Sequence, residues 1–212
     1  MRLIQITADQ ILSMDSRKRA AFMNSLSGFK SASLIGTIDN QNNANLAIFS
    51  SVIHLGSNPA LVGFINRPDS VDRHTLENII QTNYFTINHI HTDIFKQAHQ
   101  TSARYPKNIS EFEATGLTQE FLNNFKAPFV KESRIKYGLE LVEKHELKIN
   151  GTILVIGKVI EVILPQSCLL PDGAIDIEMA ETVAISGLDI YHATEKIARL
   201  SYAKTDKAPI EI

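Results

Sequence analysis

Short segments rich in branched residues, separated by turn residues, limit the possible folds more than any other feature of the chain. Strands are predicted toward both ends of the domain, whereas helical patterns at 74–82 and 92–102 cluster in its middle. This order differs from the regular strand–helix alternation of a doubly wound parallel sheet. The chain is therefore predicted to be mainly β with peripheral helices. The six predicted strands are Ser31–Ile38, Ala44–Leu55, Ala60–Ile65, Tyr84–Ile90, Tyr137–Glu143 and Ile153–Leu164.

The remaining segments fit a single domain over residues 1–212. Asp15 reads as the N-cap of a helix, so residues 1–29 are predicted to form an N-terminal helical extension. The tail at 203–212 is polar, and we expect it to lie on the surface or to reach a partner chain.

Composition excludes several classes of protein. Cys168 is the single cysteine, which excludes an internal disulfide and a thiolate metal cluster. The net charge of -2 provides no overall field that would attract nucleic acid or an anionic membrane. Polar residues interrupt the first fifteen positions, and the longest apolar runs are strand-sized. We therefore expect a cytoplasmic protein with no nucleic-acid or membrane partner.

The second predicted strand has an unusual distribution of polar residues. Within residues 43–51, Asn45, Ala47 and Phe49 share one face, and the residues between them, ending in Ser50, share the other. Polar side chains thus interrupt both faces. Taken alone, this pattern favours an edge strand with ordinary solvated positions.

Six stretches of the chain form a combined pattern in which no single stretch is diagnostic. They are Asn45-Leu46-Ala47-Ile48-Phe49-Ser50, Asn58-Pro59-Ala60-Leu61-Val62, Arg73-His74-Thr75-Leu76-Glu77-Asn78-Ile79, Tyr84-Phe85-Thr86-Ile87-Asn88, Glu111-Phe112-Glu113-Ala114-Thr115-Gly116-Leu117-Thr118 and Ala127-Pro128-Phe129-Val130-Lys131-Glu132-Ser133. In this order they resemble the FMN-binding split barrels of the flavin reductase-like family. The likeness covers roughly residues 30–164, and a later strand, Gly151 to Val159, is similar as well.

This resemblance implies a Greek-key split β-barrel that binds FMN and forms a homodimer with each flavin at or near the subunit interface. It implies that the strand from Asn45 to Ser51 runs beside the ring and ribityl chain, and that Arg73, His74 and Thr75 contact the phosphate. Arg67 is a weaker phosphate candidate. The implied cofactor residues are Asn45, Ala47, Ile48, Phe49, Ser50, Ser51, Arg67, Arg73, His74, Thr75, Tyr191 and Arg199.

These residue types suit the chemistry of FMN. Its dianionic phosphate needs cationic or hydroxyl donors, and its ring needs backbone or amide donors. The chain has neither GxGxxG nor GxxxxGK[ST], so side chains and turn amides must hold a phosphate here. Arg73, His74 and Thr75 offer a cation, an imidazole and a hydroxyl at a predicted helix start.

Two departures from the family pattern bear on function. His74 replaces the usual Asp of a Lys/Arg-Asp-Thr pattern, which makes that site more cationic. The Gly-Asp-His of many family reductases corresponds to Asn150-Gly151-Thr152, which removes the His implicated in nicotinamide handling. His145 is a weak substitute. Tyr191 could equally cover the flavin ring or pack in the core. Arg199 could equally add positive charge at the flavin site or form a surface ion pair.

Three functions remain open from the sequence. One is an FMN-dependent oxidoreductase that takes electrons from NAD(P)H or another donor, with no evident general acid or base. The second is a flavin-binding electron carrier without NAD(P)H activity, and the third is a non-catalytic dimeric binding barrel. No metal site is predicted, because His89 and His91, even with Asp93 or His54, are better explained as strand-end histidines.

Overall fold

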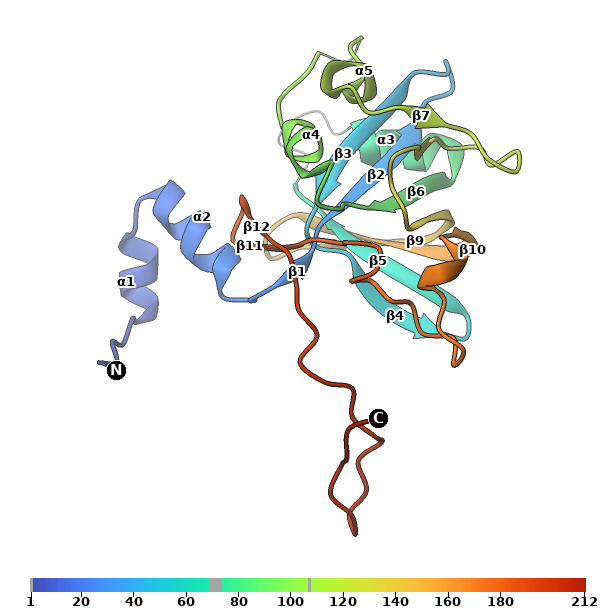
Figure 1. Ribbon diagram of the computed structural model, residues 1–212. Helices are drawn as coiled ribbons and strands as arrows, with labels where there is room; N and C mark the ends of the chain where they lie inside the picture. The colour runs from blue at the N-terminus through green and yellow to red at the C-terminus, as the bar shows by residue number, and fades with distance from the viewer. Residues whose placement is uncertain (1, 69–73, 107) are drawn as a thin grey trace.

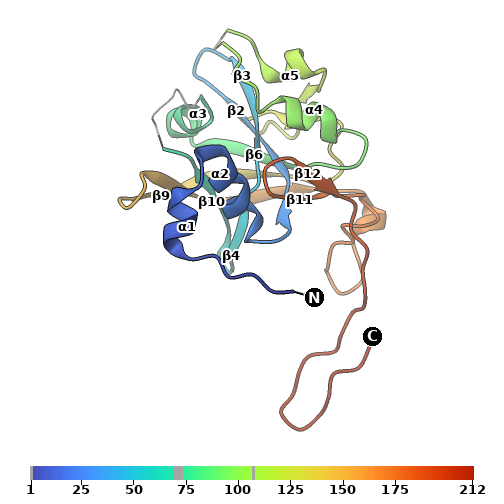
Figure 2. The ribbon, with the colours of Figure 1, turned by 90° about the vertical axis from the view of Figure 1, so that its left-hand side faces the viewer.

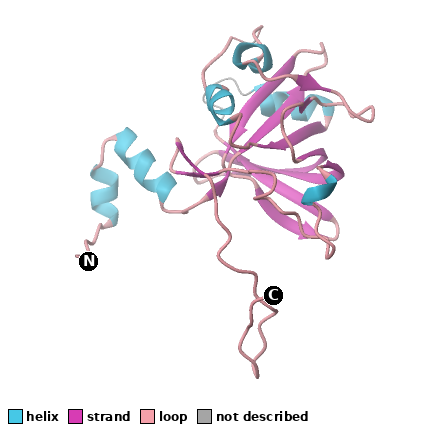
Figure 3. Cartoon of the chain, in the orientation of Figure 1, coloured by secondary structure: helices cyan, strands magenta, loops and turns pink. Residues whose placement is uncertain are grey.

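The computed structural model describes residues 2–68, 74–106 and 108–212. Its main element is a seven-stranded antiparallel sheet in the order β3-β2-β6-β9-β10-β5-β4 (Figures 1 and 3). These strands are β2 (Ser33–Ile38), β3 (Ala44–Phe49), β4 (Ile53–Ser57), β5 (Ala60–Asn66), β6 (Tyr84–His89), β9 (Lys136–Leu147) and β10 (Thr152–Ile163). The prediction of a mainly β chain with peripheral helices is confirmed.

One predicted strand is wrong in its extent. The stretch Ala44–Leu55 was expected to be continuous, but the chain leaves the sheet after Phe49 and re-enters it at Ile53. β3 pairs with β2, whereas β4 pairs with β5, so the two halves lie at opposite edges of the sheet. Branched residues resume at Val52 and Ile53 directly after Ser50 and Ser51, so the two strands looked like one in the sequence.

The sheet curls so that the chain just after β3 reaches β5. Ser51, just after β3, donates through Oγ to the Ile65 carbonyl and accepts from the Ile65 N–H group, both at 3.1 Å. The rings of Phe49 and Phe64 meet edge to face beside this link, with centroids 4.9 Å apart. A serine side chain therefore replaces the missing strand ladder between β3 and β5. The result is a barrel that is closed on one side by side-chain contacts.

Helices cover both faces of the β2–β3 hairpin (Figure 1). Helix α3 (His74–Thr82) packs on β2 and β3, with Leu76 and Ile79 buried in the barrel core beside Phe49 and Phe64. Two further helices, α4 (Phe95–Gln100) and α5 (Glu111–Thr115), cover the other face, where Leu46 joins a second core. The helix expected at 92–102 is thus shorter than predicted.

Segments at the two ends of the chain lie outside the barrel. Helices α1 (Ala8–Ser13) and α2 (Ser16–Ser25) project from one side, and residues beyond 192 extend away as an arm (Figures 1 and 2). A small sheet of β1 (Lys30–Ser31), β11 (Ala184–Ser186) and β12 (Ile190–His192) joins them to the body. The remaining elements are the two-stranded sheet of β7 (Gln119–Glu120) and β8 (Phe129–Val130) and the short 3-10 helix η1 (Gln166–Cys168). No helix in the described ranges is long and apolar enough to span a bilayer.

Candidate functional site

Strand β3, the predicted cofactor strand, is an edge strand whose two faces are both covered. The structure confirms the face alternation, because Asn45 and Phe49 face the α3 side while Leu46 and Ile48 pack toward α4 and α5. The edge position is confirmed as well. The expectation of ordinary solvated positions is wrong, because Asn45 and Leu46 are buried and the rest of β3 is partly buried.

Asn45 and Thr75, both predicted to bind the cofactor, are brought together by the fold. Asn45 Nδ2 donates to Thr75 Oγ1 at 3.0 Å and to Thr37 Oγ1 at 3.3 Å. Asn78 Nδ2 also donates to Thr37 Oγ1, at 3.2 Å. Because Thr75 Oγ1 is an acceptor in this network, its own hydrogen remains available for another acceptor. The start of α3, with His74 partly exposed, is thereby locked against β3.

Sequence reasoning missed Glu111, which holds the exposed edge of β3. Its Oε2 atom accepts the backbone N–H of Leu46 at 3.0 Å, and its side chain is buried at 8% exposure. Burial raises the pKa of the Glu111 carboxyl, against the smaller opposing effects of the Leu46 hydrogen bond and nearby His74. No sequence signal marks a contact that joins residues 65 positions apart.

The contact from Glu111 limits which part of β3 a ligand can reach. Outward-facing peptide groups alternate along an edge strand, so the Ile48 N–H and C=O groups point the same way as those of Leu46. Leu46 is occupied by Glu111, whereas Ile48 makes no such contact among the described residues. The open part of the edge therefore runs from Ile48 through Ser50 and Ser51.

Two cations gather at the Ser51 end of β3. Arg67 is the residue after β5 and is exposed. Burial lowers the pKa of the Lys30 ammonium, and the nearby positive charge of Arg67 lowers it further. Lys30 Nζ donates to the Gly187 carbonyl at 2.8 Å, and Ser31 Oγ donates to the Val52 carbonyl at 3.3 Å. Lys30 was not predicted, and its position depends on β1 pairing with a late strand.

Arg73 lies outside the described residues. The chain runs from Arg67 at one end of β3 to His74 at the other, and residues 69–73 lie between them. Six strand residues at about 3.3 Å each separate these ends by roughly 17 Å. His74 and Thr75 therefore lie at the opposite end of the strand from Arg67.

The β9–β10 turn lies beside this region and carries no imidazole at its tip. A Cβ atom placed on Gly151 would stand 3.5 Å from the Pro68 Cβ, so the turn contacts the residue after Arg67. Asn150 Oδ1 accepts from the Thr152 N–H and hydroxyl groups, at 3.1 and 2.8 Å. His145 is exposed and pairs with Glu143 at 2.7 Å. The turn that lacks the family His is thus next to the candidate site.

The two C-terminal candidates have partners of their own. Tyr191 is half-buried, and its hydroxyl lies 3.1 Å from His99 Nδ1 with the Phe95 ring 5.5 Å away. Burial, with a smaller contribution from Asp189, raises the pKa of Tyr191 to about 12. Arg199 forms an ion pair with Asp172. The contacts of Tyr191 match the alternative of packing, and the ion pair of Arg199 matches the alternative of a surface ion pair. Neither contact tests a role at the cofactor.

A cavity of about 550 Å³ opens between the β2–β3 turn and α5. None of the predicted cofactor residues lines it, so it does not support the flavin site. The lining residues are Asn42, Asn43, Ala44, Asn108, Ser110, Phe112, Glu113, Gly116, Leu117, Thr118 and Gln119.

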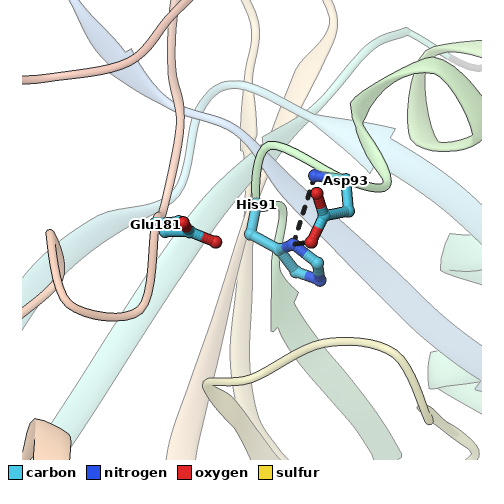
Figure 4. A group of neighbouring side chains, drawn as sticks. All are labelled: His91, Asp93 and Glu181. Atoms are coloured by element: carbon cyan, nitrogen blue, oxygen red, sulfur yellow. Dashed lines mark hydrogen bonds and ion pairs between the residues drawn. The ribbon is translucent and has the colours of Figure 1, made fainter.

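The fold also assembles His91, Asp93 and Glu181, whose potential ligand atoms all lie within 4.8 Å of one another (Figure 4). Glu181 comes from a distant segment and was not expected here. Arg134 pairs with both carboxylates, and the nitrogens of His91 contact the Glu132 carbonyl at 3.0 Å and the Asp93 N–H at 3.3 Å. The Arg134 guanidinium already pairs with both carboxylates, so the group acts as an ion-pair network between three segments.

Comparison with known proteins decides the family. A family model described as the flavin reductase like domain matches residues 27–172. The chain belongs to the flavin reductase-like family. A crystal structure of a candidate flavin reductase with a split barrel domain, from Shewanella frigidimarina NCIMB 400, is 57% identical, with a TM-score of 0.92 over 94% of this chain and 100% of that chain. The predicted split-barrel fold is confirmed by this likeness.

Solved structures of lower identity are similar to this chain in fold alone. Nitrilotriacetate monooxygenase component B from Bacillus cereus is 18% identical, with a TM-score of 0.82 over 94% of this chain and 100% of that chain. Flavoredoxin of Desulfovibrio vulgaris (Miyazaki F) is 23% identical, with a TM-score of 0.69 over 85% and 93%. An uncharacterized protein of Aquifex aeolicus (strain VF5) is 28% identical over 109 residues, 50% of this chain and 56% of that protein's length. Family membership supports a flavin-dependent oxidoreductase in general terms.

Proposed function

We propose that this flavin reductase-like protein is an FMN-dependent oxidoreductase that works as a cytoplasmic homodimer. It takes electrons from NAD(P)H or another donor and passes them through FMN to an acceptor. The observation that carries the proposal is the open edge of β3 between Ile48 and Ser51, flanked by Arg67 and Lys30 at one end and by the Asn45–Thr75 pair at the other.

The residues present fit FMN. An edge strand offers unpaired peptide groups for the polar rim of a flat ring, and Ile48 has such groups on the open edge. The Thr75 hydroxyl and His74 would supply donors for a phosphate at the start of α3, and Arg73, the preceding residue in the sequence, would add a cation. Arg67 and Lys30 would favour negative charge at the Ser51 end, where a reduced ring needs it. When bound, the flavin supplies the hydride and electron chemistry.

The protein residues in this scheme bind and orient, and they do not transfer protons. Asn45 fixes the start of α3 through Thr75, and Ser51 fixes the other end of β3 through Ile65. Glu111 keeps the strand edge in register by holding Leu46. Such fixed donors lower the cost of ordering a site on binding, which is the contribution expected from a protein around a redox cofactor.

Charge removal tests the phosphate end. Arg73→Ala should weaken FMN by roughly 10- to 100-fold, the loss of one charge-assisted hydrogen bond, while riboflavin binding changes little. Arg67→Ala should affect FMN and riboflavin alike if Arg67 serves the ring. Titrations of flavin fluorescence measure both ligands, with Arg104→Ala as a control for a distant exposed cation. Equal loss of both ligands in Arg73→Ala would contradict the phosphate role.

A flavin-binding electron carrier without NAD(P)H activity remains a second candidate, because no His stands on the β9–β10 turn beside Pro68. Anaerobic mixing with NADH or NADPH separates the two. Bleaching of the flavin absorbance within seconds supports the oxidoreductase, whereas bleaching only by dithionite supports the carrier. A colourless protein that fails to quench added FMN would instead indicate a non-catalytic binding barrel.

A further inference from the structure

The cavity between the β2–β3 turn and α5 lies apart from the candidate flavin site. Its volume of about 550 Å³ falls within the roughly 300–1,000 Å³ typical of small-molecule sites. Figure 1 shows the turn and α5 at the same end of the molecule, away from both chain termini. Strand β3 begins at the cavity, at Ala44, and its six residues at about 3.3 Å each place the Ser51 end roughly 17 Å away.

The wall of the cavity on the hairpin side is fixed by Asp39. Its Oδ1 atom accepts the N–H groups of Gln41 and Asn43, both at 2.8 Å, and its Oδ2 atom accepts from Asn43 Nδ2 at 2.9 Å. Asn42, between them, has a φ of 66°, and its side chain makes no hydrogen bond with a described residue. The turn therefore presents a free carboxamide to the cavity from a fixed backbone.

The wall on the α5 side is fixed as well. The buried carboxylate of Glu111 holds this helix to the Leu46 N–H group, and Phe112 packs in the core below. Past the end of α5, the Glu132 carboxylate accepts the Thr118 N–H group with both oxygens, each at 3.1 Å. A backbone that is held in place before a ligand arrives loses little freedom on binding, which favours affinity.

Ser110 lines the cavity and has an unsatisfied hydroxyl group. It is the residue before α5, but its side chain does not cap that helix, and its Oγ atom is shielded from solvent without a hydrogen-bond partner among the described residues. A buried hydroxyl without a partner is unfavourable. Rotation about the Cα–Cβ bond can turn this hydroxyl toward the cavity, where a polar ligand would satisfy it.

The charges around the cavity select against ions. Among the described residues that line it there is no Lys, Arg or His, so an anion would find no opposite charge there. Glu113 is the one charged residue in the same set, and it is exposed. A single solvated carboxylate attracts a cation only weakly, because water screens the interaction. The lining therefore favours a neutral ligand.

The polar side chains favour a ligand rich in hydroxyl groups. Asn42, Asn108 and Gln119 each offer an amide donor and an amide acceptor, and none of the three is hydrogen-bonded through its side chain to a described residue. Thr118 adds a hydroxyl, and Ala44 adds a small apolar surface for C–H groups. A ligand hydroxyl matches these partners because it both donates and accepts, whereas an apolar ligand would leave them unpaired.

We propose that this cavity is a second ligand-binding site, for a neutral polyhydroxylated molecule such as a sugar or a cyclic polyol. The three free carboxamides and the Ser110 hydroxyl recognise the ligand, which bridges the β2–β3 turn and α5. None of the predicted cofactor residues lines the cavity, so this site is separate from the flavin and does not depend on the proposed function.

Titration of the isotope-labelled full chain with glucose, maltose and myo-inositol tests the site. The side-chain amide signals of Asn42, Asn108 and Gln119 in NMR spectra report directly on the cavity. At least one of these neutral probes should shift those signals saturably, with a Kd on the order of 1 mM or tighter. Inorganic phosphate and spermidine, an anion and a cation, should not shift them.

Gly116→Asn should block the cavity. Gly116 lines it with a φ of 72°, a Cβ atom there would meet nothing within 4 Å, and asparagine tolerates this conformation better than most residues. The added carboxamide should raise the Kd about 10-fold or more. Gly28→Asn is the matched control, with a φ of 71° and equally open surroundings in the N-terminal segment, and it should bind as the parent does.

Ser110→Ala provides a second variant that keeps the fold, because its Oγ atom makes no hydrogen bond with a described residue. It should weaken binding by roughly 3- to 10-fold, the loss of one neutral hydrogen bond. If thermal unfolding shows that Gly116→Asn does not fold, Ser110→Ala decides the question.

Loss of the shifts in Gly116→Asn and their retention in Gly28→Asn would support the site. No saturable shift with any of the three neutral probes, a shift that the cavity variants leave unchanged, or preferential binding of phosphate or spermidine would overturn it. Addition of FMN to the same samples reports on the flavin site, so the failure of one site is distinguishable from the failure of the other.

Discussion

Replacing Glu111 by alanine removes the acceptor that the structure gives to the buried Leu46 N–H on the edge of β3. A buried donor left without a partner costs about 1–3 kcal/mol. Part of this is offset, because burial of the carboxylate is itself unfavourable, as the raised pKa of Glu111 shows. We therefore expect the free energy of unfolding to fall by about 2 kcal/mol, which lowers Tm by roughly 4–8 °C in a chain of this size.

Glu111→Gln is the matched control. The amide keeps an oxygen acceptor for Leu46 and removes the buried charge, so its stability near neutral pH should lie within about 1 kcal/mol of the parent. Urea unfolding followed by circular dichroism measures all three proteins. If Glu111→Gln loses as much as Glu111→Ala, the hydrogen bond to Leu46 is not what stabilises the strand.

The pH dependence adds a second test. The pKa of Glu111 in the folded chain is raised above its ordinary value of 4.5, so the folded state binds more protons than the unfolded state between these two values. The parent should therefore be most stable relative to Glu111→Gln below pH 4.5, and should lose that advantage as the pH rises through the folded pKa. A difference that grows with pH would refute this account of the buried carboxyl.

Two further changes test the core and a buried titratable group. Gly36→Ala should destabilise the fold by at least about 3 kcal/mol, because its Cβ would lie 2.3 Å from the Pro128 carbonyl oxygen and 2.6 Å from Thr86 Oγ1. Gly56→Ala, whose Cβ meets Pro59 O at 3.3 Å, should cost under about 1 kcal/mol in the same urea assay. Burial lowers the pKa of His89 from 6.5 to about 4, so the unfolded chain binds more protons between these values and stability falls as the pH drops through this window. His89→Gln should flatten that fall by up to about 1.4 kcal/mol per pH unit, and parallel curves for parent and variant would contradict it.

The local pattern of polar and apolar residues predicted part of the fold. The alternation of residues 43–51 predicted correctly which side chains share a face of β3, because side-chain direction along a strand has a period of two whatever surrounds it. It did not reveal the break at Ser50–Val52. The break arises because the two strands pair with different neighbours: β3 pairs with β2, and β4 pairs with β5.

The candidate site divides in the same way. Asn45 and Thr75 belong to motifs readable from the chain, and the fold brings the two side chains within 3.0 Å. Lys30 belongs to no such motif, and Glu111 opens one of the family-like stretches without any sign in the sequence of its contact with Leu46. Their places beside Arg67 and Leu46 depend on β1 pairing with β11 and on α5 packing over β3.

What the sequence determined alone was therefore the β-rich class, the alternation of faces along β3 and the family, since each follows from local periodicity or from short ordered motifs. The tertiary structure decided how much of the β3 edge remains open, how the barrel is closed by Ser51 and Ile65, and which surfaces project without cover. Those properties arise from contacts between residues far apart in the chain, and such contacts depend on how elements pack and not on the pattern within any one of them.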